Sequence, residues 1–168
     1  SAASDVYKRQ IAFPQLTMGP ILRYREWRGA LKERTITRED VFSGFELFVV
    51  GLCFKVLLAD QLAPLWASLE RIGYEYLSTP LAWLGAVSYS LQLYFDFSGY
   101  SDMAIGMGRI FGFKYMENFR LPYTAKSITD FWRRWHISLS SFFRDYVYIP
   151  LGGKKKHLSL IHISEPTR

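Results

Sequence analysis

The sequence predicts an all-α fold: a polytopic bundle of transmembrane helices that includes re-entrant segments. Hydrophobic residues make up 49% and aromatic residues 17% of the 168 residues, which excludes a disordered chain. Two long apolar stretches, 41–69 and 81–113, each exceed the roughly 20 residues that a helix needs to cross a bilayer. The net charge of +6 is concentrated in segments that flank these stretches, as in the loops of membrane proteins.

The two ends of the chain do not read as native protein. Residues 1–10 and 158–168 resemble translated sequencing-adapter read-through, so we leave them out of the fold as one does with processing scars. We expect residues 11–157 to be the central part of a membrane domain. The chain is then an internal fragment in which no signal peptide can be read.

The first apolar segment, 11–22, is uncharged but carries two prolines, which predicts a broken or re-entrant segment rather than a continuous helix. Residues 23–40 form a polar, mostly basic connector. At its end Thr37 and Asp40 have the spacing of a capping box, so we expect a helix to begin there.

Residues 41–69 have a helical, mainly apolar composition, interrupted by Glu46, Lys55 and Asp60. After a short polar link, residues 76–95 carry no charge at all, and we take this run as the strongest membrane signal in the chain.

Residues 81–113 would measure about 50 Å as one helix, which is longer than a ~30 Å hydrocarbon core is thick. We therefore expect a kink near Ser98 and Gly99, or a tilted helix buried in protein. Gly108 and Gly112 have the GxxxG spacing that is associated with close helix packing.

Residues 114–126 form a second basic loop. Ser127 and Asp130 then have the spacing of another capping box, and the helix that starts there should end before Pro150. The positive-inside rule places both basic loops in the cytoplasm, so residues 41–69 lead outward and 81–113 return.

His136 is the residue in this last helix that best suits catalysis. At helical spacing it shares a broad apolar face with Trp132, Trp135, Leu139, Phe142, Phe143 and Tyr146. An imidazole in an apolar setting can act as a general base because its unperturbed pKa lies near neutrality. The alternative, a buried histidine that serves only a structural hydrogen bond, is the more frequent case.

The neighbouring residues leave alternatives open. Trp132 and Trp135 more often belong to a core or an interfacial belt than to a substrate platform. The segment holds three arginines: Arg133, Arg134 and Arg144. They suit a phosphate or the headgroup of a thioester carrier, and equally an ion pair with Asp130 or Asp145 at helical spacing.

Asp96 and Asp102 lie in the second apolar stretch, where ionisable groups are costly and usually face a cavity or a partner. Arg109 is a plausible partner for Asp102. A structural ion pair and a proton relay both remain open.

Several other classes are excluded. The single cysteine, Cys53, excludes an internal disulfide and a cysteine-based zinc site, and we expect no metal. Residues 106–108 do not continue as GxGxxG, because Phe111 replaces the last glycine, and no HExxH, GxSxG or P-loop is present. The aromatic residues lie in long apolar runs, which argues against a nucleic-acid-binding module.

Residues 13–27 (FPQLTMGPILRYREW), 89–113 and 117–153 (including FWRRWHISLSSFFRDY) resemble the membrane-bound O-acyltransferase family, and within it the bacterial alginate O-acetyltransferase branch. The resemblance implies a multi-pass enzyme of the bacterial inner membrane, bowl-shaped with a central funnel. It implies that an acyl group passes from a cytoplasmic acyl-CoA or acyl-carrier thioester to a hydroxyl of a cell-surface polysaccharide or to a periplasmic acetyltransferase partner. No cofactor is expected.

The resemblance also assigns roles. His136 matches the histidine of the family's WRRWH motif, which implies base chemistry or positioning of the thioester. The candidate pocket residues around it are Trp132, Arg133, Trp135, Arg144, Asp145 and Asp96. The family's second histidine, commonly taken as the principal base, has no counterpart here, since His157 follows a lysine triplet and His162 lies in residues 158–168. We therefore expect this piece to be inactive alone.

Two alternatives stay open. One is a non-catalytic membrane scaffold or transporter subunit of a polysaccharide-export complex, in which Asp96, Asp102 and Arg109 line a path or dock a partner. The other is D-alanyl transfer to teichoic acid.

Overall fold

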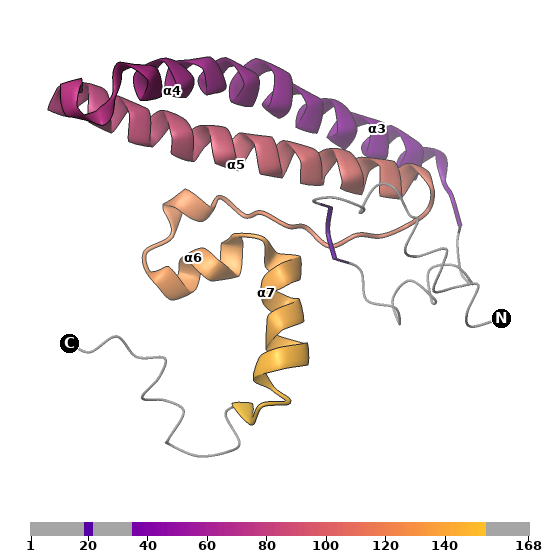
Figure 1. Cartoon of the computed structure of the whole chain (residues 1–168). Helices are drawn as coiled ribbons and strands as arrows, with labels where there is room; N and C mark the ends of the chain where they lie inside the picture. Colours follow the sequence, from indigo (N-terminus) through magenta and orange to yellow (C-terminus); the bar gives the residue numbers. More distant parts are fainter. Residues whose placement is uncertain (1–18, 22–34, 154–168) are drawn as a thin grey trace.

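The computed structural model describes residues 19–21 and 35–153, and over these ranges the chain forms helices, turns and connecting segments without a strand. A long antiparallel helical hairpin lies above two shorter helices that follow it in the chain (Figure 1). The broken segment expected at 11–22, most of the connector at 23–40, and both chain ends lie outside the described residues.

The first arm of the hairpin is a continuous run of helix from α3 (Arg38–Cys53) through the π-helical turn η2 (Phe54–Ala59) to α4 (Asp60–Ile72). Its start confirms the predicted capping box. The Thr37 hydroxyl accepts a hydrogen bond from the Asp40 backbone N–H at 3.1 Å, and the Asp40 carboxylate accepts one from the Thr37 N–H at 3.0 Å. The prediction of a helix over 41–69 is likewise confirmed.

This 35-residue arm is, within the described part of the chain, the one helix whose length and hydropathy suit a membrane span. The expectation that residues 76–95 carry the strongest membrane signal was wrong. That run lacks charges, but its tyrosine, serine and glutamine residues make it less apolar than the first arm. The absence of charge is a weaker criterion than a high content of aliphatic residues.

The second arm is α5 (Thr79–Ile110), which has 32 residues and packs antiparallel against α3 and α4 (Figure 1). The expected kink at Ser98 and Gly99 is not formed, and the helix is continuous there. Both residues are buried, and Gly99 lies in the contact with the first arm.

Two pairs of glycines bring the arms together. A Cβ atom on Gly51 would lie 2.5 Å from the Gly99 carbonyl oxygen, and a Cβ on Gly44 would lie 2.7 Å from the Gly106 carbonyl oxygen. The helix backbones therefore touch at both points, as small residues allow in membrane helix pairs. Because the arms run antiparallel, the seven-residue spacing in one arm matches the same spacing in the other.

The GxxxG pair singled out in the sequence has a different role. Gly108 faces the ring of Tyr115, which leaves no room for a side chain. Gly112 has a φ of 77° and ends α5, where the Phe113 N–H donates to the Gly108 carbonyl at 2.7 Å and the Gly112 N–H donates to the Arg109 carbonyl at 2.9 Å. These are the two bonds of a Schellman motif. The prediction that this pair mediates helix packing was wrong.

The last third of the described chain is a loop over 111–127, containing the short turn η4 (Pro122–Thr124), followed by α6 (Ile128–Arg134), α7 (Ile137–Phe143) and the π-helical turn η5 (Arg144–Tyr148). The single helix expected from Ser127 to before Pro150 was wrong, because the backbone leaves the helix at residues 135 and 136. Figure 1 shows α6 and α7 running in different directions from that break.

Candidate active site

His136 occupies the break between α6 and α7. Its backbone has a φ of 45° and a ψ of 58°, the left-handed region that costs an L residue other than glycine about 1–2 kcal/mol. The residue is the N-cap of α7, yet its side chain makes no capping hydrogen bond. The spacing had predicted that His136 shares a helical face with the aromatic residues on both sides of it. That prediction was wrong, because the helix stops here.

The loop before α6 holds the break from both sides. The Arg120 N–H donates to the Arg134 carbonyl at 2.9 Å, and the Ile137 N–H donates to the Asn118 carbonyl at 3.0 Å. The Asn118 side-chain oxygen also accepts from the N–H of Ser138 at 3.1 Å and from its hydroxyl at 2.8 Å.

Asn118 and Ser138 were missed by the sequence reasoning, although each is only 1% exposed. One signal for the first was available, since Asn118 is the single asparagine of the chain. No local signal connects Ser138 to it, because the contact joins residues 20 positions apart.

The His136 ring lies among aromatic rings from two other segments. Its centroid is 4.7 Å from that of Phe97 on α5, in an edge-to-face arrangement, and 6.5 Å from that of Phe119 in the loop, in a stacked one. Burial lowers the pKa of the imidazole below its usual value, so that the neutral form predominates at neutral pH.

The Nε2 atom of His136 is buried and has no hydrogen-bond partner among the described residues. Four other side-chain atoms of the described residues share this state, Gln92 Oε1, Ser98 Oγ, Ser101 Oγ and Asn118 Nδ2, but of these five residues only His136 combines it with a left-handed backbone. A histidine that serves only a structural hydrogen bond would have its ring nitrogen satisfied within the fold. A neutral imidazole with a free nitrogen can instead accept a proton from a bound group.

The two tryptophans, Trp132 and Trp135, have different surroundings in the structure. The Trp135 ring packs on Phe119 at 5.1 Å and on Phe131 at 5.6 Å, within the same aromatic cluster as His136. Trp132 is 55% exposed and lies at the edge of this cluster, where its ring meets Phe131 edge-to-face. Of the two, Trp135 therefore shares both ring neighbours of His136, Phe97 and Phe119.

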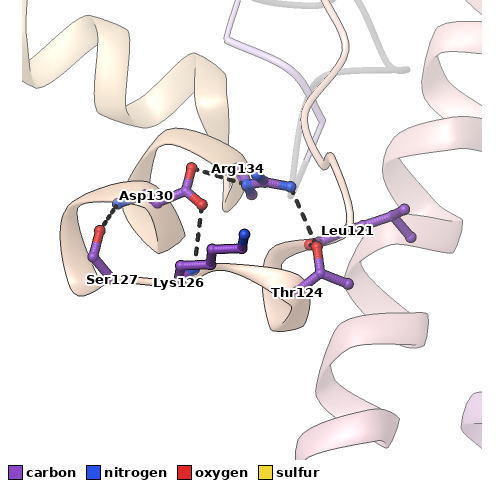
Figure 2. Close-up of polar contacts among 6 residues, drawn as sticks. All are labelled: Leu121, Thr124, Lys126, Ser127, Asp130 and Arg134. Atoms are coloured by element: carbon purple, nitrogen blue, oxygen red, sulfur yellow. Dashed lines mark hydrogen bonds and ion pairs between the residues drawn. The ribbon is translucent and has the colours of Figure 1, made fainter.

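Arg134 is held in a structural network (Figure 2). Its Nε pairs with Asp130 at 3.0 Å, and its Nη1 donates to the Thr124 hydroxyl at 3.2 Å. The ion-pair alternative therefore applies to this arginine, and the same contact holds the pKa of Asp130 below its usual value. Arg133 is exposed and forms no ion pair with a carboxylate of the described residues.

Asp130 also explains why the second capping box is only half formed. The Ser127 hydroxyl accepts from the Asp130 N–H at 3.1 Å, which confirms Ser127 as the N-cap of α6. The Asp130 carboxylate, however, faces Arg134 and the Lys126 N–H, at 3.4 Å from the latter (Figure 2).

Arg144 and Asp145 pair with each other at 2.8 Å within η5. The Arg144 side chain is largely exposed, whereas that of Asp145 is mostly covered.

Asp96 is paired with a residue that the sequence reasoning did not connect to it. The Lys55 ammonium lies 2.7 Å from Asp96 on α5 and 2.8 Å from Asp60 at the start of α4. Lys55 and Asp60 are five residues apart, the spacing that a π-helical turn brings together. The expected pair of Asp102 and Arg109 is not formed in the described structure.

Over residues 19–21 and 35–153, no group of three or more histidine, cysteine, aspartate or glutamate side chains is arranged to hold a metal ion.

Comparison with known proteins places these features in a family. The family model of the membrane-bound O-acyltransferases matches residues 11–162. The chain is 51% identical, over 86% of its length, to the probable alginate O-acetylase AlgI of Pseudomonas fluorescens. It is 45% identical, over 85%, to the peptidoglycan O-acetyltransferase of Helicobacter pylori, and 34% identical, over 82%, to the teichoic acid D-alanyltransferase of Bacillus subtilis. It spans only 29%, 28% and 35% of these relatives, respectively.

Proposed function

Because the chain belongs to the membrane-bound O-acyltransferase family, we propose that the full-length protein containing it transfers an acyl group to a hydroxyl of a cell-surface polysaccharide. The names of the relatives support an acyl transfer to a polymer of the cell envelope, alginate, peptidoglycan or teichoic acid. The proposed donor is an acyl-CoA or acyl-carrier thioester on the cytoplasmic side of the inner membrane. The acyl group reaches the polymer directly or through a periplasmic acetyltransferase partner.

His136 takes part in the proton transfer of this reaction. Its neutral imidazole accepts the proton of the acceptor hydroxyl, or positions the thioester for a base from another part of the full-length protein, while the oxygen attacks the thioester carbonyl. The tetrahedral intermediate then collapses to the ester, and the thiolate leaves and takes up a proton. Trp135 and the rings of Phe97 and Phe119 exclude water that would hydrolyse the thioester.

The single observation that carries the proposal is the Nε2 atom of His136. It is buried without a partner among the described residues, on a residue held in a left-handed backbone conformation. Strained backbone and unpaired polar groups concentrate at functional sites, where the surrounding structure maintains them.

The test is acyl transfer by the full-length protein with His136→Ala, measured as acetylation of the polysaccharide. Loss of general base catalysis should lower the rate by about 10²–10⁴-fold. The matched control is Glu117→Gln, which removes an exposed ion pair with Arg120. Retained activity of His136→Ala at normal membrane levels would contradict an essential role for the histidine.

A scaffold or transporter subunit is the alternative from a different functional class. It relied on Asp96, Asp102 and Arg109 in α5, of which Asp96 is paired with Lys55, whereas Asp102 and Arg109 do not pair with each other in the described structure. Hydrolysis of a labelled acyl thioester by the purified full-length protein distinguishes the two, because a scaffold leaves the donor intact. The same assay with acetyl and D-alanyl donors identifies the acyl group.

A further inference from the structure

The geometry points to a second functional residue: Asn118 is a positioning residue that holds His136 in its left-handed conformation and leaves the imidazole free for proton transfer. This inference rests on the proposed function of the His136 site. Asn118 lies in the loop over 111–127, outside the segment that contains the histidine.

The start of α7 is capped from another segment of the chain. The first N–H groups of a helix lack partners within the helix, and the N-cap side chain normally accepts a hydrogen bond from one of them. His136 stands at the N-cap but makes no such bond. Asn118 supplies both acceptors instead, its carbonyl to the Ile137 N–H and its side-chain oxygen to the Ser138 N–H. The cap therefore comes from another segment, and the imidazole is not used for it.

The same loop also holds the end of α6, on the other side of the break. Two residues after Asn118, the Arg120 N–H donates to the Arg134 carbonyl at 2.9 Å. The loop thus fixes the chain immediately before and immediately after Trp135 and His136. A left-handed backbone at a residue with a side chain persists only where the surroundings impose it.

An asparagine at position 118 differs from an aspartate in its charge. The Asn118 side-chain oxygen accepts two donors from Ser138, so an aspartate could make the same two bonds. An aspartate would bring a negative charge next to the histidine, and a nearby opposite charge stabilises the protonated imidazole. The rings that contact His136, Phe97 of α5 and Phe119 of the loop, do not ionise. Asparagine therefore holds the backbone and keeps the base neutral.

The experiment compares Asn118→Ala and Asn118→Asp with Glu117→Gln in the full-length protein. The measurements are kcat and KM for the donor, per folded molecule, and the pH profile of kcat/KM. We expect Asn118→Ala to lower kcat by about 10²-fold with little change in KM, because the histidine is misplaced. Asn118→Asp should recover most of kcat at high pH, with the acidic limb of its profile moved up by about one pH unit or more. Glu117→Gln should match the wild type.

Two results overturn the inference. One is a wild-type kcat for Asn118→Ala per folded molecule. The other is an acidic limb of Asn118→Asp that coincides with the wild-type limb, since a purely structural asparagine would change the amount of folded protein and not the base.

A second measurement separates this inference from the proposed function. Diethyl pyrocarbonate modifies the neutral imidazole, so the pH dependence of His136 modification, followed by mass spectrometry, reports its pKa without catalysis. If the wild-type protein transfers no acyl group, the proposed function fails. The Asn118 inference then stands or falls on whether Asn118→Asp moves the modification midpoint to higher pH.

Discussion

At the scale of single residues, His136 combines a left-handed backbone, a buried ring nitrogen without a partner and a pKa lowered by burial. The first two cost folding free energy and the third costs it only at acidic pH, and none stabilises α7, whose cap comes from Asn118. A residue that destabilises its own surroundings in three ways is better explained by chemistry than by packing.

The lowered pKa of His136 predicts how stability depends on pH. The unfolded chain binds a proton at about pH 6.5, whereas the folded chain binds it only at lower pH. The free energy of unfolding is therefore complete above pH 6.5 and decreases as the pH falls through 6.5 toward the folded pKa. Thermal unfolding of the full-length protein and of His136→Gln between pH 5 and 8 checks this. The wild type should lose more stability on acidification, and parallel curves would contradict the assignment.

Leu121 offers a test of backbone strain without catalysis. It also has a positive φ, of 46°, and its side chain is 66% exposed. Leu121→Gly removes the steric cost and little buried surface, so it should leave stability unchanged or raise it by up to about 1 kcal/mol. A clear fall in the melting temperature would contradict backbone strain at this residue.

Local chemistry explains which residues the sequence could predict. Thr37 and Ser127 were recognised as helix caps because their partners lie three residues away. The break at His136 was not, since neither Trp135 nor His136 is a helix-breaking residue. Its cause is a set of hydrogen bonds from Asn118 and Arg120, which no local pattern encodes.

At the scale of the elements, the hairpin depends on backbone contact at two glycine pairs. Gly51→Ala places a methyl group 2.5 Å from the Gly99 carbonyl oxygen, where only backbone can yield. We expect a loss of about 1–3 kcal/mol through the forced separation of the arms. Gly85→Ala is the matched control, because its methyl group meets the end of the Leu69 side chain at 3.2 Å. Melting temperatures of the two variants check this, and an equal effect would contradict the close approach.

The Lys55 contacts predict a non-additive effect between the two arms. Lys55→Met leaves Asp96 and Asp60 without their cation, which is costly in an apolar environment. The single variant should lose about 1 kcal/mol or more, and adding Asp96→Leu should restore part of that loss. A double-mutant cycle on thermal stability measures the coupling. If the two losses simply add, the charges do not interact in the membrane.

At the scale of the whole molecule, the hairpin, the loop over 111–127 and the break at His136 form one unit. The arms place Phe97 against His136, and the loop supplies both Asn118 and Phe119 to the same site. The resemblance to the membrane-bound O-acyltransferases, first carried by the WRRWH segment, is confirmed by the family match over residues 11–162. The sequence could predict the family and single out His136 as a candidate, but the arrangement around it required the fold, because its parts lie up to about 40 residues apart.

The orientation in the membrane is a prediction of its own. The basic segments 23–38 and 114–126 place both ends of the hairpin in the cytoplasm, so that the connection between α4 and α5 faces outward. A cysteine introduced at Glu75, in a protein with Cys53→Ser, should react with a membrane-impermeant maleimide from outside the intact membrane. Labelling only after the membrane is broken would contradict this orientation.

The most direct measurement is acyl transfer to the polysaccharide by the full-length wild type and by His136→Gln, at equal membrane levels, between pH 5 and 8. The account predicts that the wild type stays active below pH 6.5, because burial lowers the pKa of the base. It also predicts that the variant is slower by about 10²-fold or more across the range. A variant as fast as the wild type at every pH would show that the buried imidazole has no part in the reaction.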